Sequence, residues 1–177
     1  LPDKAYLQLY YFMRFKKPCH FRNPKTFSEK MQWLKLYNRK KIYTVMADKY
    51  AAKDYVAEKI GSEDIIPTYG VWDSFDQIDF DALPEQFVLK CTHDSGGLIV
   101  CRDKSKLDLE KTKKILAKSL KNDFYIEARE WPYKNVKRKI INFSLIMMIL
   151  LSLVSQILSL LKSNNQIIHI RVPFFNP

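Results

Sequence analysis

A run of 22 residues without any charge, from 140 to 161, constrains this chain more than any other feature of its sequence. The run is mostly Ile, Leu, Met and Val. Roughly 20 helical residues are enough to cross the hydrocarbon core of a bilayer. Basic residues stand on both sides, with Lys134, Lys137, Arg138 and Lys139 before the run and Lys162 after it. If the run spans a membrane, the larger basic cluster places the N-terminal part in the cytoplasm.

The same run contains polar residues, which weaken the prediction of a membrane span. They are Asn142, Ser144, Ser152, Ser155, Gln156 and Ser159. Two alternatives therefore stay open, namely a buried helix and a tail that does not belong to the original protein. On this pattern we divide the chain into a domain at 1–139, a hydrophobic segment at 140–161 that we expect to be helical, and a tail at 162–177.

Composition excludes several protein classes. The 177 residues are 47% hydrophobic and include only 4 Gly, which excludes collagen-like, low-complexity and wholly disordered chains. The 3 cysteines are widely spaced, which argues against a disulfide framework and indicates a reducing compartment. The chain starts with Leu1 rather than Met and shows no signal-peptide pattern, so we expect it to begin inside a longer reading frame.

The formal net charge of +11 points to a negatively charged partner. The charge is uneven, because residues 60–89 contain seven acidic residues and no Lys or Arg. Candidate partners are a nucleotide, a sugar nucleotide, an anionic glycan and a membrane face. The sequence contains no nucleic-acid-binding motif, so we expect no nucleic-acid partner.

Hydrophobic spacing within 1–139 predicts an α+β fold. Thr26 and Glu29 form a capping box that starts one helix. A second helix is expected from about Met46 to Ile60, with Gly61 as its C-cap. A third is expected from about Leu109 to Leu120, with its lysines mostly outward.

Three short segments have the composition of strands. Residues 65–67 and 69–72 together form a short strand that Pro67 interrupts, which favours an edge position. Residues 87–91 and 98–101 flank a turn and should pair as an antiparallel hairpin.

Lys90 and the turn that follows it carry the clearest chemical signal. A lysine supplies a point charge, and successive backbone amides in a turn can bind anionic oxygens. The turn is His93, Asp94, Ser95, Gly96 and Gly97. Its two glycines would permit a close backbone approach and a positive φ. The pattern indicates a phosphate-binding site that is not a Walker A loop, although the same residues also form a good hairpin turn without any ligand.

Other residue combinations are weaker signals. Cys91, His93 and Cys101 offer three zinc ligands at a spacing that fits no common site, and Cys91 beside His93 lacks a third group to orient a base. We therefore predict no metal site, and buried structural cysteines. Residues 79–81 read Asp-Phe-Asp, a pattern that can hold a metal and a sugar nucleotide but also suits a solvated loop. Arg129, Glu130 and Trp131 could stack on a base or sugar, or could simply form a packed loop.

In order along residues 18–141, these segments resemble the TupA-like ATP-grasp family of bacterial polysaccharide-biosynthesis proteins. The resemblance is carried by NPKTFSEKMQWLK at 23–35, ADKYA at 47–51, VWDSF at 71–75, LPEQFVLKC at 83–91, HDSGG at 93–97 and REWPYK at 129–134. The family name refers to teichuronopeptide synthesis, and its members are often labelled glycosyltransferases. The resemblance implies the N-terminal portion of an ATP-grasp fold, which in other proteins serves ATP-dependent carboxylate–amine ligation.

The resemblance also implies roles for individual residues. Asp48, Lys49 and Lys53 match the segment that opens an ATP-grasp module, and Lys90 matches the lysine that contacts the α- and β-phosphates. Residues 93–97 match the glycine-rich flap over the nucleotide. In the intact family, ATP and Mg²⁺ serve to activate a carboxylate as an acyl phosphate, which an amine then attacks.

The chain departs from the family pattern after Ile141. Asn142 and Phe143 stand where an acidic hinge should begin, and residues 142–177 contain no Asp or Glu, so the metal-binding carboxylates are missing. A frameshift is one explanation, since Ile and Met codons such as those at 146–149 can conceal Asp codons in another frame. We accordingly expect a truncated domain and poor solubility for residues 1–139 alone.

Three functional readings follow. The first is a truncated ATP-grasp-like protein of cell-surface polysaccharide synthesis, whose parent activity is ATP-dependent ligation or transfer and whose partners are a nucleotide and an anionic polysaccharide precursor. The second is a membrane-anchored, non-catalytic module that binds an anionic glycan or lipid. The third is a glycosyltransferase. The expected location is the cytoplasm, or the cytoplasmic face of the inner membrane if 140–161 is an anchor.

Overall fold

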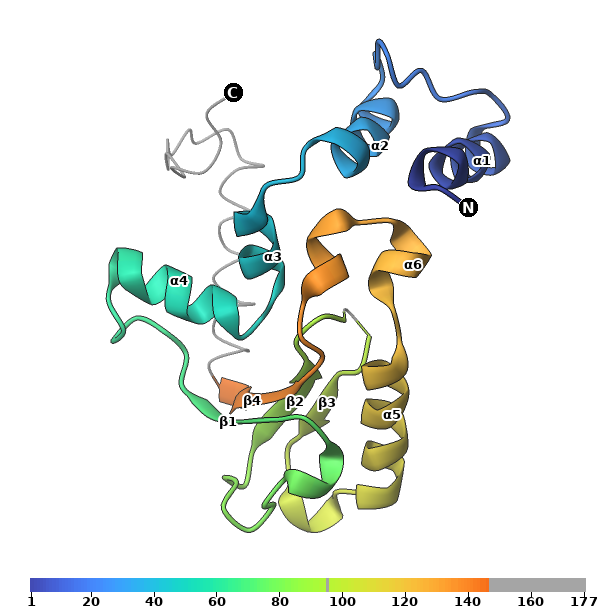
Figure 1. Ribbon diagram of the computed structural model, residues 1–177. Coiled ribbons are helices and arrows are strands. Elements are labelled where there is room, and N and C mark those ends of the chain that lie inside the picture. The colour runs from blue at the N-terminus through green and yellow to red at the C-terminus, as the bar shows by residue number, and fades with distance from the viewer. Residues whose placement is uncertain (95, 147–177) are drawn as a thin grey trace, which may run out of the picture.

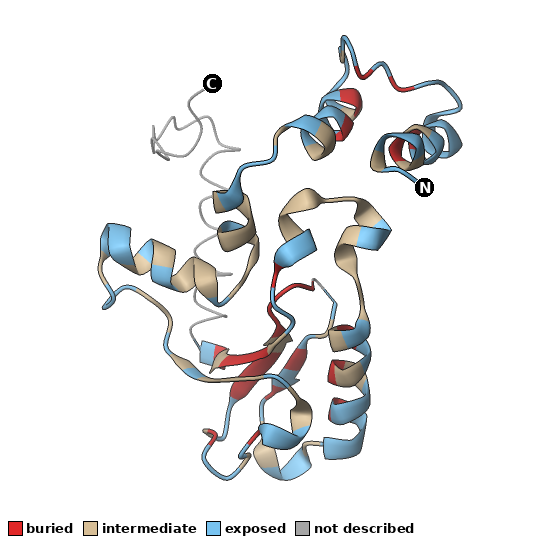
Figure 2. Ribbon diagram, in the orientation of Figure 1, coloured by how far each residue is buried: buried red, intermediate tan, exposed pale blue. Residues whose placement is uncertain are grey.

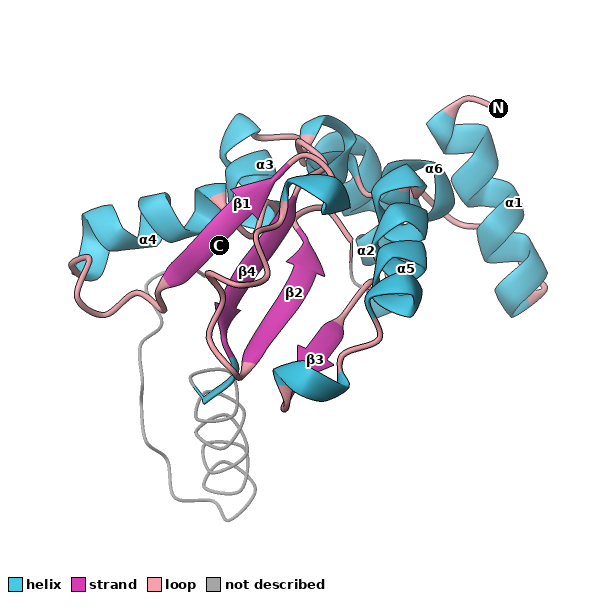
Figure 3. Cartoon of the chain, turned by 90° about the horizontal axis from the view of Figure 1, so that it is seen from below, coloured by secondary structure: helices cyan, strands magenta, loops and turns pink. Residues whose placement is uncertain are grey.

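Four strands form one antiparallel sheet in the computed structural model, which describes residues 1–94 and 96–146 (Figures 1 and 3). Their order across the sheet is β1 (Thr68–Trp72), β4 (Ile140–Ser144), β2 (Phe87–Cys91) and β3 (Ile99–Cys101). The α+β class is confirmed, as are the hairpin of β2 with β3 and the edge position of β1.

Strand β4 corrects the prediction of a helix that begins at residue 140. Its residues pair with β1 on one side and with β2 on the other, with Ile141 opposite both Val71 and Lys90. A short apolar stretch such as 140–144 suits a buried strand as well as part of a helix, and hydrophobic spacing alone does not separate the two. The rest of the hydrophobic segment, from residue 147, and the tail at 162–177 lie outside the described residues. Most of the residues that the frameshift hypothesis concerns lie there too. Within the described ranges, no helix combines the length and the hydropathy that a membrane span requires.

One face of the sheet packs against helix α5 (Leu109–Lys121) to form the main core. Side chains alternate along β2, so Phe87, Leu89 and Cys91 share this face with Ile140. Leu116 of α5 lies against them, and all five side chains are fully buried. Figure 2 shows that buried residues gather on the strands of the sheet. Complete burial of one such aliphatic or aromatic side chain contributes about 1.5–3 kcal/mol.

Two N-terminal helices have a small core of their own. Helix α1 (Asp3–Phe15) buries Leu7 and Tyr11 against Cys19 and Phe21 in the loop that leads to α2 (Phe27–Tyr37). The predicted capping box is confirmed, because Thr26 Oγ1 accepts the Glu29 amide and the Glu29 carboxylate accepts the Thr26 amide. Helix α2 therefore begins where the sequence predicts.

The helix predicted from Met46 to Ile60 is divided in two. Helix α3 (Lys41–Ala47) ends before Asp48, and α4 (Ala51–Ile60) begins after Tyr50. The Asp48 carboxylate accepts the amides of Tyr50 and Ala51, which favours a turn over a continuous helix. Gly61 ends α4 with a φ of 103°, as predicted for a C-cap.

Short elements complete the described chain. Three 3₁₀ turns cover Phe75–Gln77, Lys104–Lys106 and Trp131–Asn135, and helix α6 covers Phe124–Ala128. Helix α5 has the predicted position and outward lysines, and the Asp108 carboxylate caps it by accepting the Lys111 amide. The turn at 131–135 packs against α3.

Candidate functional site

The turn after β2 is anchored by three polar residues that are almost completely buried, Thr92, His93 and Asp94. The Thr92 amide donates to the Lys139 carbonyl at 2.9 Å, and the Lys139 amide donates to Thr92 Oγ1 at 3.0 Å. Thr92 therefore joins the end of β2 to the chain that enters β4.

His93 fixes the turn to the C-terminal end of α5. Its Nε2 lies 3.2 Å from the Ser119 carbonyl and 3.1 Å from the Asn122 carbonyl. Both partners are acceptors, so Nε2 carries the proton. Burial lowers the pKa of His93 below its ordinary value, which keeps the ring neutral at physiological pH.

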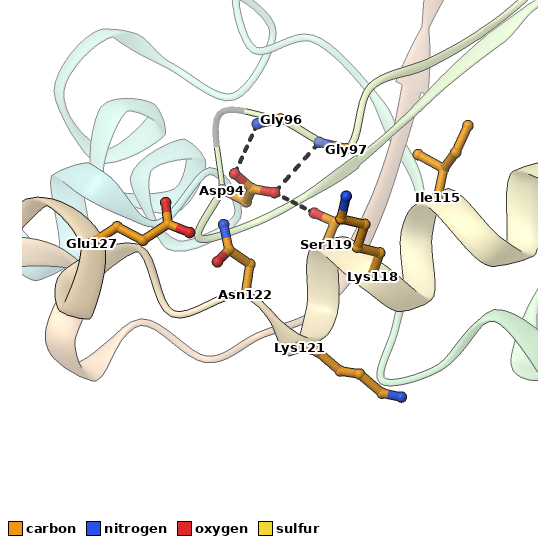
Figure 4. A pocket seen from close by; sticks show the side chains of 9 residues that line it. All are labelled: Asp94, Gly96, Gly97, Ile115, Lys118, Ser119, Lys121, Asn122 and Glu127. Atoms are coloured by element: carbon orange, nitrogen blue, oxygen red, sulfur yellow. Dashed lines mark hydrogen bonds between the residues drawn. The ribbon is translucent and has the colours of Figure 1, made fainter.

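Asp94 organises the two glycines of the turn (Figure 4). Its carboxylate accepts the Gly96 amide at 2.8 Å, the Gly97 amide at 3.4 Å and the Ser119 hydroxyl. Burial alone would raise the pKa of Asp94, but these hydrogen bonds outweigh it and lower the pKa. In this conformation the two amides donate to a carboxylate of the same chain.

Gly97 permits a close approach to α5. A Cβ built at this position would lie 2.4 Å from Ser119 Oγ, so a larger residue would meet the helix. The predicted positive φ is not found at Gly97. Ser95 lies outside the described residues.

Two lysines lie near the start of the turn, Lys90 on the sheet face away from α5 and Lys49 beside the end of β2. Lys90 of β2 is half-buried and pairs in register with Ile141, so its side chain leaves the sheet away from Leu89 and Cys91. Lys49 approaches from the segment between α3 and α4, and its Nζ donates to the carbonyls of Asp94 at 2.6 Å and Thr92 at 3.2 Å. Burial lowers the pKa of Lys49, and the nearby positive charge of Lys90 lowers it further.

Lys90 is the lysine of this pair that is available to a ligand. Among the described residues, its Nζ has no hydrogen-bond or ion-pair partner, whereas Lys49 already holds the turn. Two close positive charges, one of them without an internal partner, favour an anion at this position.

The other two residues of the predicted opening segment stabilise local structure. Lys53 Nζ donates to the Ile66 carbonyl and to Thr68 Oγ1, and it lies 5.7 Å from the centre of the Phe143 ring. Burial lowers the pKa of Lys53. Asp48 forms the turn that separates α3 from α4.

A hollow lies on the other side of the turn, beside α5. It has a volume of about 560 Å³ and is lined by Asp94, Gly96, Gly97, Ile115, Lys118, Ser119, Lys121, Asn122 and Glu127 (Figure 4). Neither Lys90 nor Lys49 lines it. A second hollow of about 350 Å³ lies beside α3 and α4 and includes Asp48, Thr92, Lys137 and Lys139. The hollow beside α5 contains two lysines and two carboxylates, so its formal charges balance. The pair of Lys90 and Lys49 is therefore the better candidate for binding an anion.

Arg129 stacks on side chains of its own chain. Its guanidinium lies 4.6 Å from the Tyr6 ring centre and 5.6 Å from that of Tyr125, and it is 3.6 Å from the Asp3 carboxylate. The Arg129 guanidinium, which could stack on a base or sugar, thus already has two aromatic neighbours. Glu130 faces Lys35 at 3.6 Å, and Trp131 starts the 3₁₀ turn that packs on α3.

The weaker metal patterns are not assembled in the described part of the chain. Cys101 pairs with Phe87, at the opposite end of β2 from Cys91, so the two thiols cannot share a metal with His93. Asp79 accepts the amides of Asp81 and Ala82 in a local turn. Within residues 1–94 and 96–146, no group of three His, Cys, Asp or Glu side chains could hold a metal ion.

Sequence reasoning missed Ser119 and Asn122, which hold the turn from α5. A usable signal existed, because Thr112 and Ser119 lie on the same helical face as the buried Leu116. A polar residue on an apolar stripe is typically hydrogen-bonded, and here Ser119 bonds Asp94.

Comparison with known proteins gives one match. Residues 29–145 match the family model described as TupA-like ATPgrasp. No curated protein and no solved structure matches the chain.

Proposed function

Because the chain belongs to the TupA-like ATP-grasp family, we propose that Lys90, with Lys49 beside it, binds the phosphates of ATP next to the turn at 92–97. The observation that carries the proposal is the position of Lys90, half-buried on a central strand without a partner among the described residues. A phosphate would neutralise the repulsion that Lys90 exerts on Lys49.

The turn would serve as a positioning element for the same phosphates. Its residues are held from α5 by His93 and Asp94 and from the sheet by Thr92. For the Gly96 and Gly97 amides to reach a phosphate, the Asp94 carboxylate would have to release them. Ligand binding and rearrangement of the turn are therefore coupled in this proposal.

ATP, when bound, would supply the phosphoryl group that activates a carboxylate for attack by an amine. We place this chemistry in the synthesis of a bacterial cell-surface polysaccharide, in the cytoplasm, with an anionic precursor that suits the chain's net charge of +11. Within the described residues, no group of three carboxylates, histidines or thiols is assembled. The proposal for this part of the chain is therefore limited to nucleotide binding.

No specific observation favours the alternative of a glycosyltransferase. Its support was Asp79 and Asp81, and the Asp79 carboxylate accepts two backbone amides in a local turn. The membrane-anchored module depends on residues that are mostly outside the described part of the chain.

Equilibrium dialysis with ATP tests the proposal. We expect Lys90→Met to weaken ATP binding by roughly tenfold to a hundredfold, because a hydrogen bond to a charged group contributes about 1.5–3 kcal/mol. The matched control is Lys111→Met, which removes an exposed lysine from α5 and should leave binding unchanged. Thermal melting of both variants checks that they fold. Equal affinity of the Lys90→Met variant and the original chain, or no binding by the original chain, contradicts the proposal.

A further inference from the structure

Helix α1 carries a second apolar stripe on its solvent side. Ala5, Leu9, Phe12 and Met13 follow the i, i+4, i+7, i+8 spacing of one helical face. Leu9, Phe12 and Met13 are 49%, 50% and 57% exposed. The opposite face is the one that packs, since Leu7 and Tyr11 are each 1% exposed. A helix with an ordinary outer surface would carry polar residues where this stripe lies, so the stripe indicates a partner.

The exposed charges of α1 and of the residues just after it are of one sign. Lys4, Arg14, Lys16 and Lys17 are exposed, and none of them forms an ion pair with another described residue. The only acidic residue of α1 is Asp3, which lies 2.8 Å from the Arg39 guanidinium and 3.6 Å from that of Arg129. The uncompensated charge at α1 is therefore positive, and the complementary surface is negative.

The position of α1 lets it meet a flat surface. Figure 1 shows α1 at the periphery of the molecule, far from the sheet and from α5. Helix α1 is joined to α6 by hydrogen bonds, because Tyr6 donates to the Glu127 carbonyl and Tyr125 donates to the Asp3 carboxylate. The segment also precedes residues 29–145, which match the family model.

We propose that α1 binds an anionic lipid surface, with its axis parallel to the membrane. The outer stripe would enter the boundary between headgroups and acyl chains. The long exposed side chains of Arg14, Lys16 and Lys17, at the C-terminal end of the helix, would extend to the lipid phosphates. A lipid surface suits this helix because it offers an apolar layer beneath a layer of negative charge and requires no shape complementarity. This inference uses no residue of the proposed phosphate site and none of the segment 140–161.

Vesicle co-sedimentation of the full chain tests the inference. The vesicles contain phosphatidylglycerol and phosphatidylcholine in equal parts, with pure phosphatidylcholine vesicles for comparison. We expect binding to the anionic vesicles to fall on the order of tenfold or more when Leu9→Gln, Phe12→Gln and Met13→Gln are combined. The combination of Arg14→Gln, Lys16→Gln and Lys17→Gln should lower binding by about fivefold for each charge removed.

A charge-matched variant separates α1 from general electrostatic attraction. Lys111→Gln, Lys114→Gln and Lys118→Gln remove three lysines from α5, and we expect little effect on vesicle binding. Equal loss with this variant would overturn the proposal in favour of non-specific charge. Equal binding by all variants would also overturn it, because another part of the chain would then be responsible.

A fluorescent label reports the contact directly. All three cysteines are buried, so a Met13→Cys variant can be labelled selectively with an environment-sensitive dye. We expect a blue shift with anionic vesicles at position 13 and none for the same dye at Lys111→Cys. No shift at position 13 would overturn the proposal. So would light scattering that shows a dimer of the full chain which the Leu9, Phe12 and Met13 substitutions dissociate, because the occupant would then be a second copy.

Discussion

Gly97 illustrates how a single position ties the turn after β2 to α5. A Cβ at this position would lie 2.4 Å from Ser119 Oγ, which is too close for any side chain, and Ser119 is buried and bonded to Asp94. The glycine is therefore required by space and not by backbone conformation, since Gly97 has no positive φ. The sequence shows that a glycine stands at this position of the turn, and the structure shows that the contact with Ser119 requires it.

Replacing Gly97 with alanine tests this reason. We expect Gly97→Ala to destabilise the protein by about 1–3 kcal/mol, because α5 or the turn must shift to admit the methyl group. Gly96→Ala is the matched control, since its nearest neighbour, an Asp94 carboxylate oxygen, lies at 3.2 Å, a much milder contact than the 2.4 Å at Gly97. Chemical denaturation of both variants measures the difference. A Gly97→Ala chain as stable as the Gly96→Ala chain would show that the contact with Ser119 is not limiting.

The start of α2 shows what one helix terminus requires. The buried Glu29 carboxylate accepts hydrogen bonds from the backbone amides of His20, Lys25 and Thr26 and from the Thr26 hydroxyl, and His20 Nδ1 lies 2.8 Å from it. These bonds, led by the Thr26 amide, lower the pKa of Glu29 far below its ordinary value of 4.5. Glu29 therefore joins the loop after α1 to the first turn of α2.

This helix terminus predicts a dependence of stability on pH. The folded pKa of Glu29 lies below the unfolded one, so its contribution is complete above pH 4.5 and is lost as the pH falls further. A Glu29→Gln variant should be less stable than the original chain at neutral pH and should lose less stability on acidification. Thermal melts at neutral pH and in steps below pH 4.5 measure both effects. Parallel acid profiles for the two chains would argue against this role.

The whole sheet depends on β4, which stands between β1 and β2. Without it, β1 has no strand partner among the described elements and one edge of β2 is unpaired. Unpaired strand edges promote aggregation. The loss would also remove Ile140 from the core that α5 covers.

Truncation tests the role of β4. We expect residues 1–139 to aggregate and residues 1–146 to melt cooperatively, because only the longer piece contains the central strand. Size-exclusion chromatography and calorimetry of the two pieces provide the measurement. A monodisperse, cooperatively melting 1–139 fragment would contradict the prediction.

Local patterns in the sequence were enough to predict most of the helices and strands. The capping box of Thr26 and Glu29, the C-cap Gly61 and the lysine-rich α5 all act within a few residues of the chain, and all are confirmed. Hydrophobic spacing was not enough at Asp48, where a hydrogen bond from the backbone to the side chain interrupts a helix. Hydrophobic spacing also failed to predict the strand that begins at Ile140, because the strand partners of that residue are distant in the sequence.

The sequence alone determined the α+β class, the hairpin around the turn at 93–97 and the family, because capping, turn chemistry and motif order are written in short segments. The tertiary structure decided that Lys49 reaches the turn that follows Lys90, that Asp94 occupies the amides of its own turn, and that Arg129 stacks on Tyr6. Most of these contacts join residues that are far apart in the chain. Their formation depends on how the sheet and helices pack, and no local pattern specifies that packing.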